Sequence, residues 1–219
     1  MMKEMSVDSY RLEQVTKETV ISKNQYKEIS DLIFDTDPYI YPALFGSNEA
    51  GRKNAQIILP VLFETEKDAM FSKENLFLLF SGVSVVGVLL WRKGAMTWTA
   101  EGLIDVAEML DVELNKDNVM KVSHEYVDKR YSDLDLSRES IISLVNVCVS
   151  KDVRGRGLGS RLLGYFISLH RNEPMTLCVL ADNPRAICLY KNNGFQIVNS
   201  YDGFSLDNEK PRAYEMERR

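Results

Sequence analysis

The sequence has little histidine and little cysteine, and both shortages argue against metal chemistry. Its two histidines, His124 and His170, are too few for a histidine-rich metal site. Its three cysteines are an odd number, lie inside apolar segments and lack the spacing of metal ligands. We expect them to be reduced core residues, which favours a cytoplasmic protein without a metal cofactor. These cysteines are Cys148, Cys178 and Cys188.

Long hydrophobic runs and an excess of basic residues are also absent. The longest apolar runs, such as Val83 to Trp91, are too short to span a bilayer, and the N-terminus contains no apolar signal core. The 27 Lys and Arg are outnumbered by 32 Asp and Glu, which gives a net charge of −5 and no basic footprint for nucleic acid. We therefore expect neither a membrane nor a nucleic acid as a partner.

What the sequence does contain is enough apolar residues for one sizeable core. Its 219 residues, 45% of them hydrophobic, fit a single domain over residues 1–219. Residues 97–139 carry eleven acidic and five basic residues, a net charge of −6, so the rest of the chain carries +1. Such a segment is typical of a solvated helical face, but it could also form a negative rim that attracts a cationic ligand. We interpret residues 97–139 as an acidic helical insert within the domain.

The chain is organised around residues 145–163, where a strand, a glycine-rich loop and a helix follow one another. β-Branched residues predict the strand over Ile141 to Val149, and apolar residues at helical spacing predict the helix from Leu158 onward. Between them, Arg154 to Gly159 contains three alternating glycines, which leave backbone amides accessible at the positive end of the helix. This arrangement suits a phosphate or pyrophosphate. Alternation predicts that one face of the strand holds Ile142, Leu144 and Cys148.

A glycine cluster alone is equally consistent with a tight turn between strand and helix. The P-loop pattern is absent, because no Gly-Lys-Ser/Thr follows at the required spacing. The dinucleotide-binding fingerprint fits in part, since Gly155, Gly157 and Ser160 stand where its three small residues would be. However, a spacer separates the strand from the first glycine, and no βαβ unit opens the chain. A dinucleotide-binding protein is therefore the less favoured alternative.

The segment after this helix carries a second motif. Residues 176–180 predict another strand, followed by a helix with an Asn-Pro start and an Asn-Asn-Gly end. Together the two motifs resemble the GNAT superfamily of acyl-CoA-dependent N-acyltransferases, sharply over residues 141–200 and more vaguely before them. The matching residues are Arg154, Gly157 and Gly159 of Arg-x-x-Gly-x-Gly, then Asn183, Ala186, Tyr190, Gly194 and Phe195 of Asn-x-x-Ala…Tyr…Gly-Phe.

The resemblance implies an α/β fold of the GNAT type, a mixed and mostly antiparallel sheet of about seven strands flanked by helices. The acidic helical insert would precede the central strand. A capping box at Ser22 and Gln25 predicts the first helix. Residues 48–63 predict a second helix, bent or ended near Pro60. Between these helices, Tyr39 to Phe45 is interpreted as a proline-punctuated aromatic loop that plugs the core. In this family the segment between the first two helices commonly lines the acceptor pocket, so the loop is also the candidate pocket wall. Further elements are expected as strands at 10–15, 76–80, 83–91, 195–201 and 213–216 and as helices at 103–114 and 119–131.

The resemblance also implies acetyl-CoA as the cosubstrate. The glycine loop would bind its pyrophosphate, and the edge of the central strand would pair with pantetheine. From this helix alone, a simple cap at Asn183 and a core residue at Tyr190 would be the favoured interpretation. Together with the glycine loop, we expect Asn183 near the cofactor arm and Tyr190 as the general acid toward sulfur. The expected acetyl-CoA-binding residues are Val147, Cys148, Val149, Arg154, Gly155, Arg156, Gly157, Leu158, Gly159, Ser160 and Asn183.

The general base is the point where the sequence departs from the family. Many members place a Glu or Asp on the central strand, whereas Asn146 is the only polar side chain of Val145 to Val149. We expect Asn146 to act in catalysis by relaying a water chain, with Glu125 or His124 of the insert as alternatives. For His124, an ordinary position on a helix surface is the favoured interpretation.

The expected function is N-acetylation of a primary amine. The acidic insert suggests a cationic small molecule as the acceptor, and a protein amine is the alternative acceptor. A longer acyl-CoA is an alternative donor, and a homodimer is an open possibility for the oligomeric state. Because the strand carboxylate is missing, a non-catalytic CoA-binding module with the same fold is the main rival.

Overall fold

One mixed sheet of seven strands runs through the part of the chain that the structure describes, in the order β1-β2-β3-β4-β5-β7-β6. The computed structural model describes residues 10–65, 71–94, 100–128 and 141–219. Neighbouring strands are antiparallel except β4 and β5, which are parallel, so the predicted fold class is confirmed. The strands are β1 (Tyr10–Gln14), β2 (Leu76–Ser81), β3 (Ser84–Lys93), β4 (Ile142–Val149), β5 (Met175–Leu180), β6 (Gln196–Asp202) and β7 (Arg212–Arg218).

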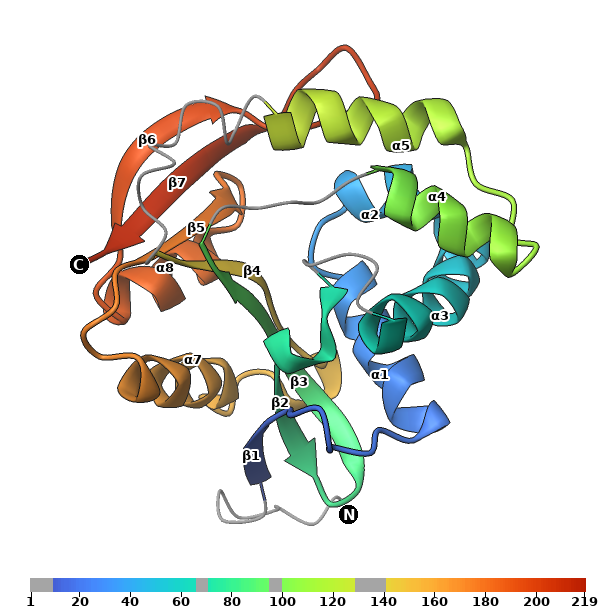
Figure 1. Cartoon of the computed structure of the whole chain (residues 1–219). Coiled ribbons are helices and arrows are strands. Elements are labelled where there is room, and N and C mark those ends of the chain that lie inside the picture. Colours follow the sequence, from blue (N-terminus) through green and yellow to red (C-terminus); the bar gives the residue numbers. More distant parts are fainter. Residues whose placement is uncertain (1–9, 66–70, 95–99, 129–140) are drawn as a thin grey trace.

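Helices cover both faces of this sheet (Figure 1). One face carries α7 (Leu158–Leu169) and α8 (Pro184–Asn192). The other carries α1 (Lys23–Phe34), α2 (Ile40–Phe45), α3 (Asn48–Thr65), α4 (Ala100–Met109) and α5 (Lys116–Val122). Three short turns complete the list: η3 (Lys73–Asn75), the π-helical η4 (Ser123–Asp128) and η5 (Lys151–Val153). We call the two hydrophobic layers the α1-side core and the α7-side core.

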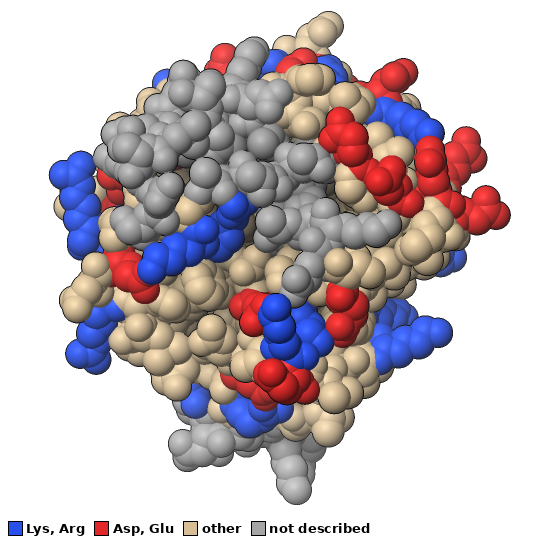
Figure 2. All heavy atoms as spheres, in the orientation of Figure 1, with Lys and Arg blue, Asp and Glu red and all other residues tan. Residues whose placement is uncertain are grey.

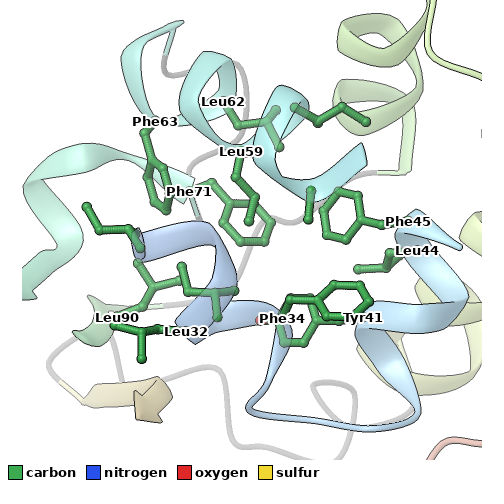
Figure 3. Close-up of a cluster of buried hydrophobic side chains, with 14 of the residues drawn as sticks. Leu32, Phe34, Tyr41, Leu44, Phe45, Leu59, Leu62, Phe63, Phe71 and Leu90 are labelled. Atoms are coloured by element: carbon green, nitrogen blue, oxygen red, sulfur yellow. The ribbon is translucent and has the colours of Figure 1, made fainter. Parts of the chain in front are cut away.

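The central hairpin separates these two cores. Alternate side chains of β2 point to opposite faces, so Phe77 and Leu79 enter the α7-side core while Leu78 and Phe80 enter the α1-side core. This confirms the expectation that the hairpin is covered on both faces. Figure 3 shows the aromatic part of the α1-side core, where side chains from α1, α2 and α3 pack together.

The start of α1 has the predicted capping box. Ser22 Oγ accepts a hydrogen bond from the backbone N–H of Gln25 at 3.3 Å, and the Ser22 N–H donates to Gln25 Oε1 at 2.9 Å. Two otherwise unpaired N–H groups of the first turn are thereby satisfied. Ile29 and Ile33, four residues apart, are completely buried and therefore mark the face of α1 that packs on the core.

Residues 40–45 are helical, which corrects the expectation of a loop over residues 39–45. α2 spans Ile40–Phe45, with Pro42 as its third residue. Proline disrupts a helix mainly by removing an N–H that would donate to the residue four positions earlier, and residues of the first turn have no such partner. The helix is anchored by its aromatic residues, since Tyr41 and Phe45 are buried with their rings stacked at 6.3 Å.

Proline also fails to end α3, which continues past Pro60 to Thr65. The missing hydrogen bond is offset by burial on both sides of the proline, because Leu59, Leu62 and Phe63 are all completely buried. α4 ends at Met109, earlier than the expected end at residue 114. Asp111 adopts the left-handed conformation with φ 54°, which a continuing helix does not allow.

The described part of the insert joins the α1-side core. Its buried side chains are Leu103, Val106 and Ala107 of α4 with Val119 and Val122 of α5. The acidic residues point the other way, and Figure 2 shows them gathered over the surface that α4 and α5 form in Figure 1. Exposed acidic residues of this surface are Glu101, Asp105, Glu108, Asp111, Glu113 and Asp117. The predicted helix at 119–131 is replaced by α5 and η4 up to residue 128, and its end lies outside the described residues.

Cysteine placement is partly as expected. All three thiols are free, with Cys148 buried and Cys178 half-buried, but Cys188 is exposed on α8. The prediction of three core cysteines was therefore wrong for Cys188, because the buried face of α8 holds Tyr190 and its opposite face is solvated. Within the described ranges, no helix is both long and apolar enough to cross a membrane, and no three His, Cys, Asp or Glu residues cluster as metal ligands.

Candidate functional site

Strands β4 and β5 pair at one end and separate at the other. Their parallel register runs from Ile142 opposite Met175 to Leu144 opposite Leu177 and then stops. Beyond this point β5 keeps pairing with β7, while β4 keeps pairing with β3. The edge of residues 145–149 that faces β5 is thus left without ladder partners among the described residues, and we call this opening the splay.

A β-bulge stands where the splay begins. Leu90 of β3 faces Asn146 and the next residue, Trp91, faces Leu144, so Val145 is an extra residue on β4. The bulge reverses the alternation of side chains along the strand. Ile142 and Leu144 lie in the α7-side core, whereas Cys148 lies in the α1-side core. The prediction that these three share one face was therefore wrong, because strict alternation assumes a strand without a bulge.

The exposed edge of β4 presents main-chain groups to the splay. Ser150 N–H donates to Val86 O of β3 at 2.8 Å, so by alternation the N–H groups of Val149 and Val147 point to the opposite edge, toward β5. The Val149 carbonyl accepts a hydrogen bond from Arg154 Nε at 2.9 Å. The side chains of Val147 and Val149 pack on the α7-side core.

The glycine loop leads from β4 into α7. Gly155 and Gly157 have φ values of 79° and 72°, in the left-handed region that favours glycine. A Cβ at either position would meet no atom within 4 Å, so the loop backbone faces open space. Gly159 is different, because it has a negative φ and room for a Cβ at ordinary contact distance from Leu189, 3.7 Å away.

Consecutive N–H groups of this loop have no partner. The first helical hydrogen bond of α7 is donated by Arg161 to Gly157 O at 3.0 Å. Within the described chain, the N–H groups of residues 155–160 before it have no hydrogen-bond acceptor. They lie at the positive end of a twelve-residue helix. The predicted loop residues from Gly155 to Ser160 therefore present unpaired donors in an arrangement that would suit an anion.

The two loop arginines are folded back onto strands. Arg154 reaches the end of β4, where its Nη2 also lies 3.9 Å from Cys148 Sγ. Arg156 Nη1 donates to the Tyr10 hydroxyl of β1 at 3.3 Å. These contacts tie Arg154, at the start of the loop, and Arg156, between its first two glycines, to the sheet, so both place positive charge beside the loop.

α8 lies next to this loop. Asn183 caps the helix through Oδ1, which accepts from the Ala186 N–H at 3.1 Å, and Pro184 follows at the first helical position, as predicted. Tyr190 is buried, with its ring edge-to-face on Phe195 at 5.9 Å. Burial raises the pKa of the Tyr190 hydroxyl, and the nearby thiols of Cys148 and Cys178 raise it further. Tyr190 is thus a protonated phenol between the two strands that splay.

Asn146 lies on the opposite face of the sheet from the glycine loop. Its side chain is buried and contacts the segment that joins α1 to α2. Asn146 Oδ1 accepts from the Tyr41 hydroxyl at 2.8 Å, and Asn146 Nδ2 donates to Thr36 Oγ1 at 2.6 Å. The candidate site residues therefore fall into two groups, with the loop, Val147, Val149 and Tyr190 on the α7 side of β4 and Asn146 and Cys148 on the other.

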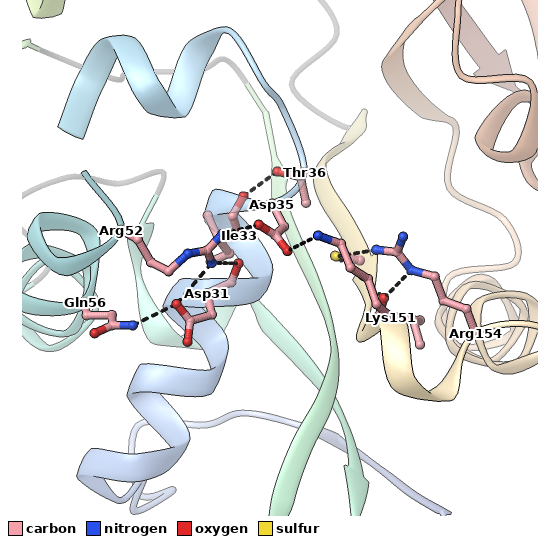
Figure 4. Close-up of polar contacts among 10 residues, drawn as sticks. Asp31, Ile33, Asp35, Thr36, Arg52, Gln56, Lys151 and Arg154 are labelled. Atoms are coloured by element: carbon pink, nitrogen blue, oxygen red, sulfur yellow. Dashed lines mark hydrogen bonds and ion pairs between the residues drawn. The ribbon is translucent and has the colours of Figure 1, made fainter. Parts of the chain in front are cut away.

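Sequence reasoning missed a row of charges beside the end of β4. Asp35 Oδ1 pairs with Arg52 Nη2 at 2.5 Å, and Asp35 Oδ2 pairs with Lys151 Nζ at 3.3 Å (Figure 4). Arg52 also pairs with Asp31 at 3.2 Å. Burial acts to raise the pKa of Asp35, but Arg52 and Lys151 offset this effect and hold the pKa below its usual range. Asp35 therefore stays ionised and ties α1 and α3 to the residues that precede the glycine loop.

The insert residues considered as catalytic groups are placed elsewhere. Glu125 Oε2 forms an ion pair with Lys210 at 2.9 Å, and His124 is exposed. The exposed position of His124 agrees with its interpretation as a surface residue.

Comparisons with known proteins agree with this architecture. Residues 115–197 match the family model described as an acetyltransferase (GNAT) domain. These residues include the splayed part of β4, the glycine loop, α7, β5 and α8. No curated protein sequence matches the chain significantly.

Solved structures match over almost the whole chain. A protein described as an acetyltransferase is 17% identical with a TM-score of 0.60, covering 95% of this chain and 98% of its own. PH1933 from Pyrococcus horikoshii OT3 is 17% identical with a TM-score of 0.58, covering 96% and 98%. Naa50 from Arabidopsis thaliana, solved with the bisubstrate analogue CoA-Ac-MVNAL, is 15% identical with a TM-score of 0.53, covering 96% and 99%. At these identities the likeness concerns the fold.

Proposed function

Because the chain carries a GNAT acetyltransferase domain with the GNAT fold, we propose that it transfers an acetyl group from acetyl-CoA to a primary amine. The observation that carries this proposal is the juxtaposition of three features around one strand. The splay exposes main-chain groups of β4, the glycine loop presents unpaired N–H groups at the end of that strand, and Tyr190 lies beside both.

The donor would bind along β4. The N–H groups of residues 155–160 suit the pyrophosphate, and the N–H groups of Val147 and Val149 suit the amides of pantetheine, as an added strand would. Naa50 offers support by analogy, since a protein with this fold was solved with a CoA conjugate. Asn183, whose side chain already caps α8, would contact the cofactor from the rim of the site.

The chemical step follows from these positions. The neutral amine attacks the thioester carbonyl carbon, a C–N bond forms, and a main-chain N–H of the splayed edge stabilises the oxyanion. The C–S bond then breaks, and the Tyr190 hydroxyl gives its proton to the departing thiolate. The acylated nitrogen loses its extra proton to solvent, from which Tyr190 is protonated again.

The proton of the incoming amine is expected to leave without a residue acting as general base. Asn146 carries no titratable group, and the low pKa of Asp35 makes its carboxylate a weak base. We therefore expect kcat/KM to follow the pKa of the acceptor itself. With an alkylamine of pKa about 10 it should rise about tenfold per pH unit between about pH 6 and 9, and with an α-amine it should level off near pH 8.

Steady-state pH profiles for two such amines test this expectation. A plateau at one shared pKa near neutrality for both amines would contradict it, because a shared pKa belongs to a residue of the enzyme and not to either substrate.

The cationic acceptor suggested by the insert stays a prediction. Asp105 and Glu108 are exposed on the side of α4 that faces away from the core, and Asp111 is exposed just after the end of α4. Glu108 forms an ion pair with Lys116. If their field attracts the acceptor, the triple change to Asn, Gln and Asn should raise the KM of the best cationic amine severalfold at low ionic strength, and less at physiological salt. An unaltered KM would assign these residues to a plain solvated surface.

One pair of measurements tests the proposed function itself. Calorimetric titration should show binding of acetyl-CoA but not of NADH, which separates this proposal from a dinucleotide-binding protein. Release of CoA thiol should then exceed background with at least one member of a panel of small amines and N-terminal peptides. Tight acetyl-CoA binding with no release across the panel would favour a non-catalytic CoA-binding module.

A further inference from the structure

A continuous chain of hydrogen bonds crosses from α2 through β4 to the end of α1. The Tyr41 hydroxyl donates to Asn146 Oδ1 at 2.8 Å, Asn146 Nδ2 donates to Thr36 Oγ1 at 2.6 Å, and Thr36 Oγ1 donates to Ile33 O at 2.6 Å. Asn146 and Tyr41 are both buried, and they lie 105 residues apart in the sequence. The hydrogen-bond chain therefore joins β4 to two helices, α1 and α2, that lie more than 100 residues before it in the sequence.

The Ile33 carbonyl, at one end of this chain, determines which atom donates in each of its hydrogen bonds. Because a carbonyl oxygen can only accept, the Thr36 hydroxyl must use its proton on Ile33 O, so its oxygen is left to accept from Asn146. The nitrogen of the Asn146 amide is thereby assigned to Thr36, and its oxygen must accept from Tyr41. Both polar atoms of Asn146 are engaged in one defined orientation.

This polarity rules out proton relay through Asn146. An amide gives up or takes a proton far outside the working pH range, and passing a proton from Tyr41 to Thr36 would require the amide to change tautomer. The bonds instead hold atoms in place. Burial raises the pKa of the Tyr41 hydroxyl, so it keeps the proton that it donates to Asn146.

The position of this hydrogen-bond chain bears on where the acceptor amine would bind. Asn146 follows the Val145 bulge, where the β4–β5 ladder has just ended, so it marks the inner end of the splay. The bulge turns its side chain to the face opposite the glycine loop. On that face Asn146 contacts Tyr41, which belongs to α2. At the start of α2, Asp37 Oδ1 accepts hydrogen bonds from the N–H groups of Tyr39 and Ile40 at 2.8 Å each.

We propose that Asn146 is a positioning residue that fixes α2, through Tyr41 and Thr36, as the acceptor-side wall of the splay. The inference rests on the proposed function, because it takes the splay as the place of the thioester. It is an alternative to the expectation that Asn146 relays a water chain in catalysis. Loosening this wall would misplace the incoming amine and leave the donor, which binds on the other side of β4, unaffected.

Variants that remove single atoms of the chain test the proposal. Tyr41→Phe and Thr36→Val should each raise the KM of the acceptor amine about tenfold, with acetyl-CoA affinity within about twofold of the parent protein. Thr36→Ser, which keeps the hydroxyl, should restore the parent KM. The double variant Tyr41→Phe/Asn146→Leu should be little worse than Asn146→Leu alone, since both break the same bond.

The kinetic pattern separates this role from its alternatives. A proton relay predicts a large fall in kcat with a changed pH profile and an unchanged KM, and that result would overturn the proposal. A purely structural role predicts that acetyl-CoA affinity and melting temperature fall together with the rise in the KM of the acceptor, and that result would also overturn the proposal. Tyr165→Phe on α7, the same chemical change at a half-exposed tyrosine, is the matched control.

A readout without turnover makes failure of this inference distinct from failure of the proposed function. Amide hydrogen exchange of the full chain should become faster in α2 in Tyr41→Phe and Asn146→Leu, and stay unchanged in α7. If the parent protein acetylates no amine, the proposed function fails, while the exchange in α2 still decides whether Asn146 holds that helix. Unchanged exchange in α2 would overturn the inference.

Discussion

Replacing Tyr190 by phenylalanine should lower kcat for amine acetylation by about 10²-fold or more, with little change in the Kd of acetyl-CoA. The hydroxyl matters only when the thiolate departs, so its loss should affect the transition state and not donor binding. The phenol has no hydrogen-bond partner in the described structure, and its ring contact with Phe195 survives the change, so stability should change little. Stopped-flow thiol release and calorimetry measure the two quantities separately.

The raised pKa of Tyr190 sets the sign of its pH dependence. An acid is present below its pKa, and burial places this pKa above the usual value near 10. No loss of rate from ionisation of Tyr190 should therefore occur up to about pH 9.5. The Tyr165→Phe variant controls for the loss of a hydroxyl as such. Parent-like turnover of Tyr190→Phe would show that Tyr190 has only a packing role. A larger change in the Kd of acetyl-CoA than in kcat would make it a binding residue.

The elements around the glycine loop could be predicted because their signals are local. β-Branched residues, apolar spacing and glycine punctuation each act within a few residues, so β4, α7, β5 and α8 lie close to their expected positions. The GNAT resemblance depends on the same short segments, and it is confirmed by the family model and the fold. The individual roles of the loop residues, Asn183 and Tyr190 stay predictions.

Features that depend on partners distant in sequence could not be predicted. The Val145 bulge exists because of how β4 pairs with β3, and nothing in the β-branched run itself distinguishes an extra residue from a regular one. The ion pairs of Asp35 and the hydrogen bonds of Asn146 are similar cases, since each joins residues more than 100 positions apart or lies between helices. In the sequence, Asp35-Thr-Asp-Pro indicates only that a helix ends there.

α2 shows a different limit, in which a local rule was applied too broadly. One proline among aromatic residues over 39–45 suggested a loop, yet Pro42 lies within the first helical turn, where it costs no hydrogen bond. The aromatic residues are buried and stacked, so packing in the α1-side core stabilises a six-residue helix that would not form alone. Tertiary contacts therefore determine the element that faces Asn146.

Changing Gly157 to glutamate should raise the Kd of acetyl-CoA by about 10²-fold or more, which corresponds to about 2.7 kcal/mol. The new carboxylate would lie among the unpaired N–H groups at the start of α7, where it would occupy the anion site and repel the pyrophosphate. The fold should survive, because a Cβ at this position meets no atom within 4 Å. The left-handed φ of 72° should cost about 1–2 kcal/mol of stability.

Gly82 offers a matched control for this substitution. It lies in the β2–β3 turn with φ 61°, and a Cβ there also meets no atom within 4 Å. Gly82→Glu therefore introduces the same side chain, the same charge and nearly the same backbone strain away from the loop. Calorimetry and thermal unfolding should show similar melting temperatures for the two variants and a loss of acetyl-CoA binding only in Gly157→Glu. If both variants bind acetyl-CoA with the affinity of the parent protein, the glycine loop does not bind the pyrophosphate. The glutamate at position 157 would then lie among those N–H groups without displacing a ligand.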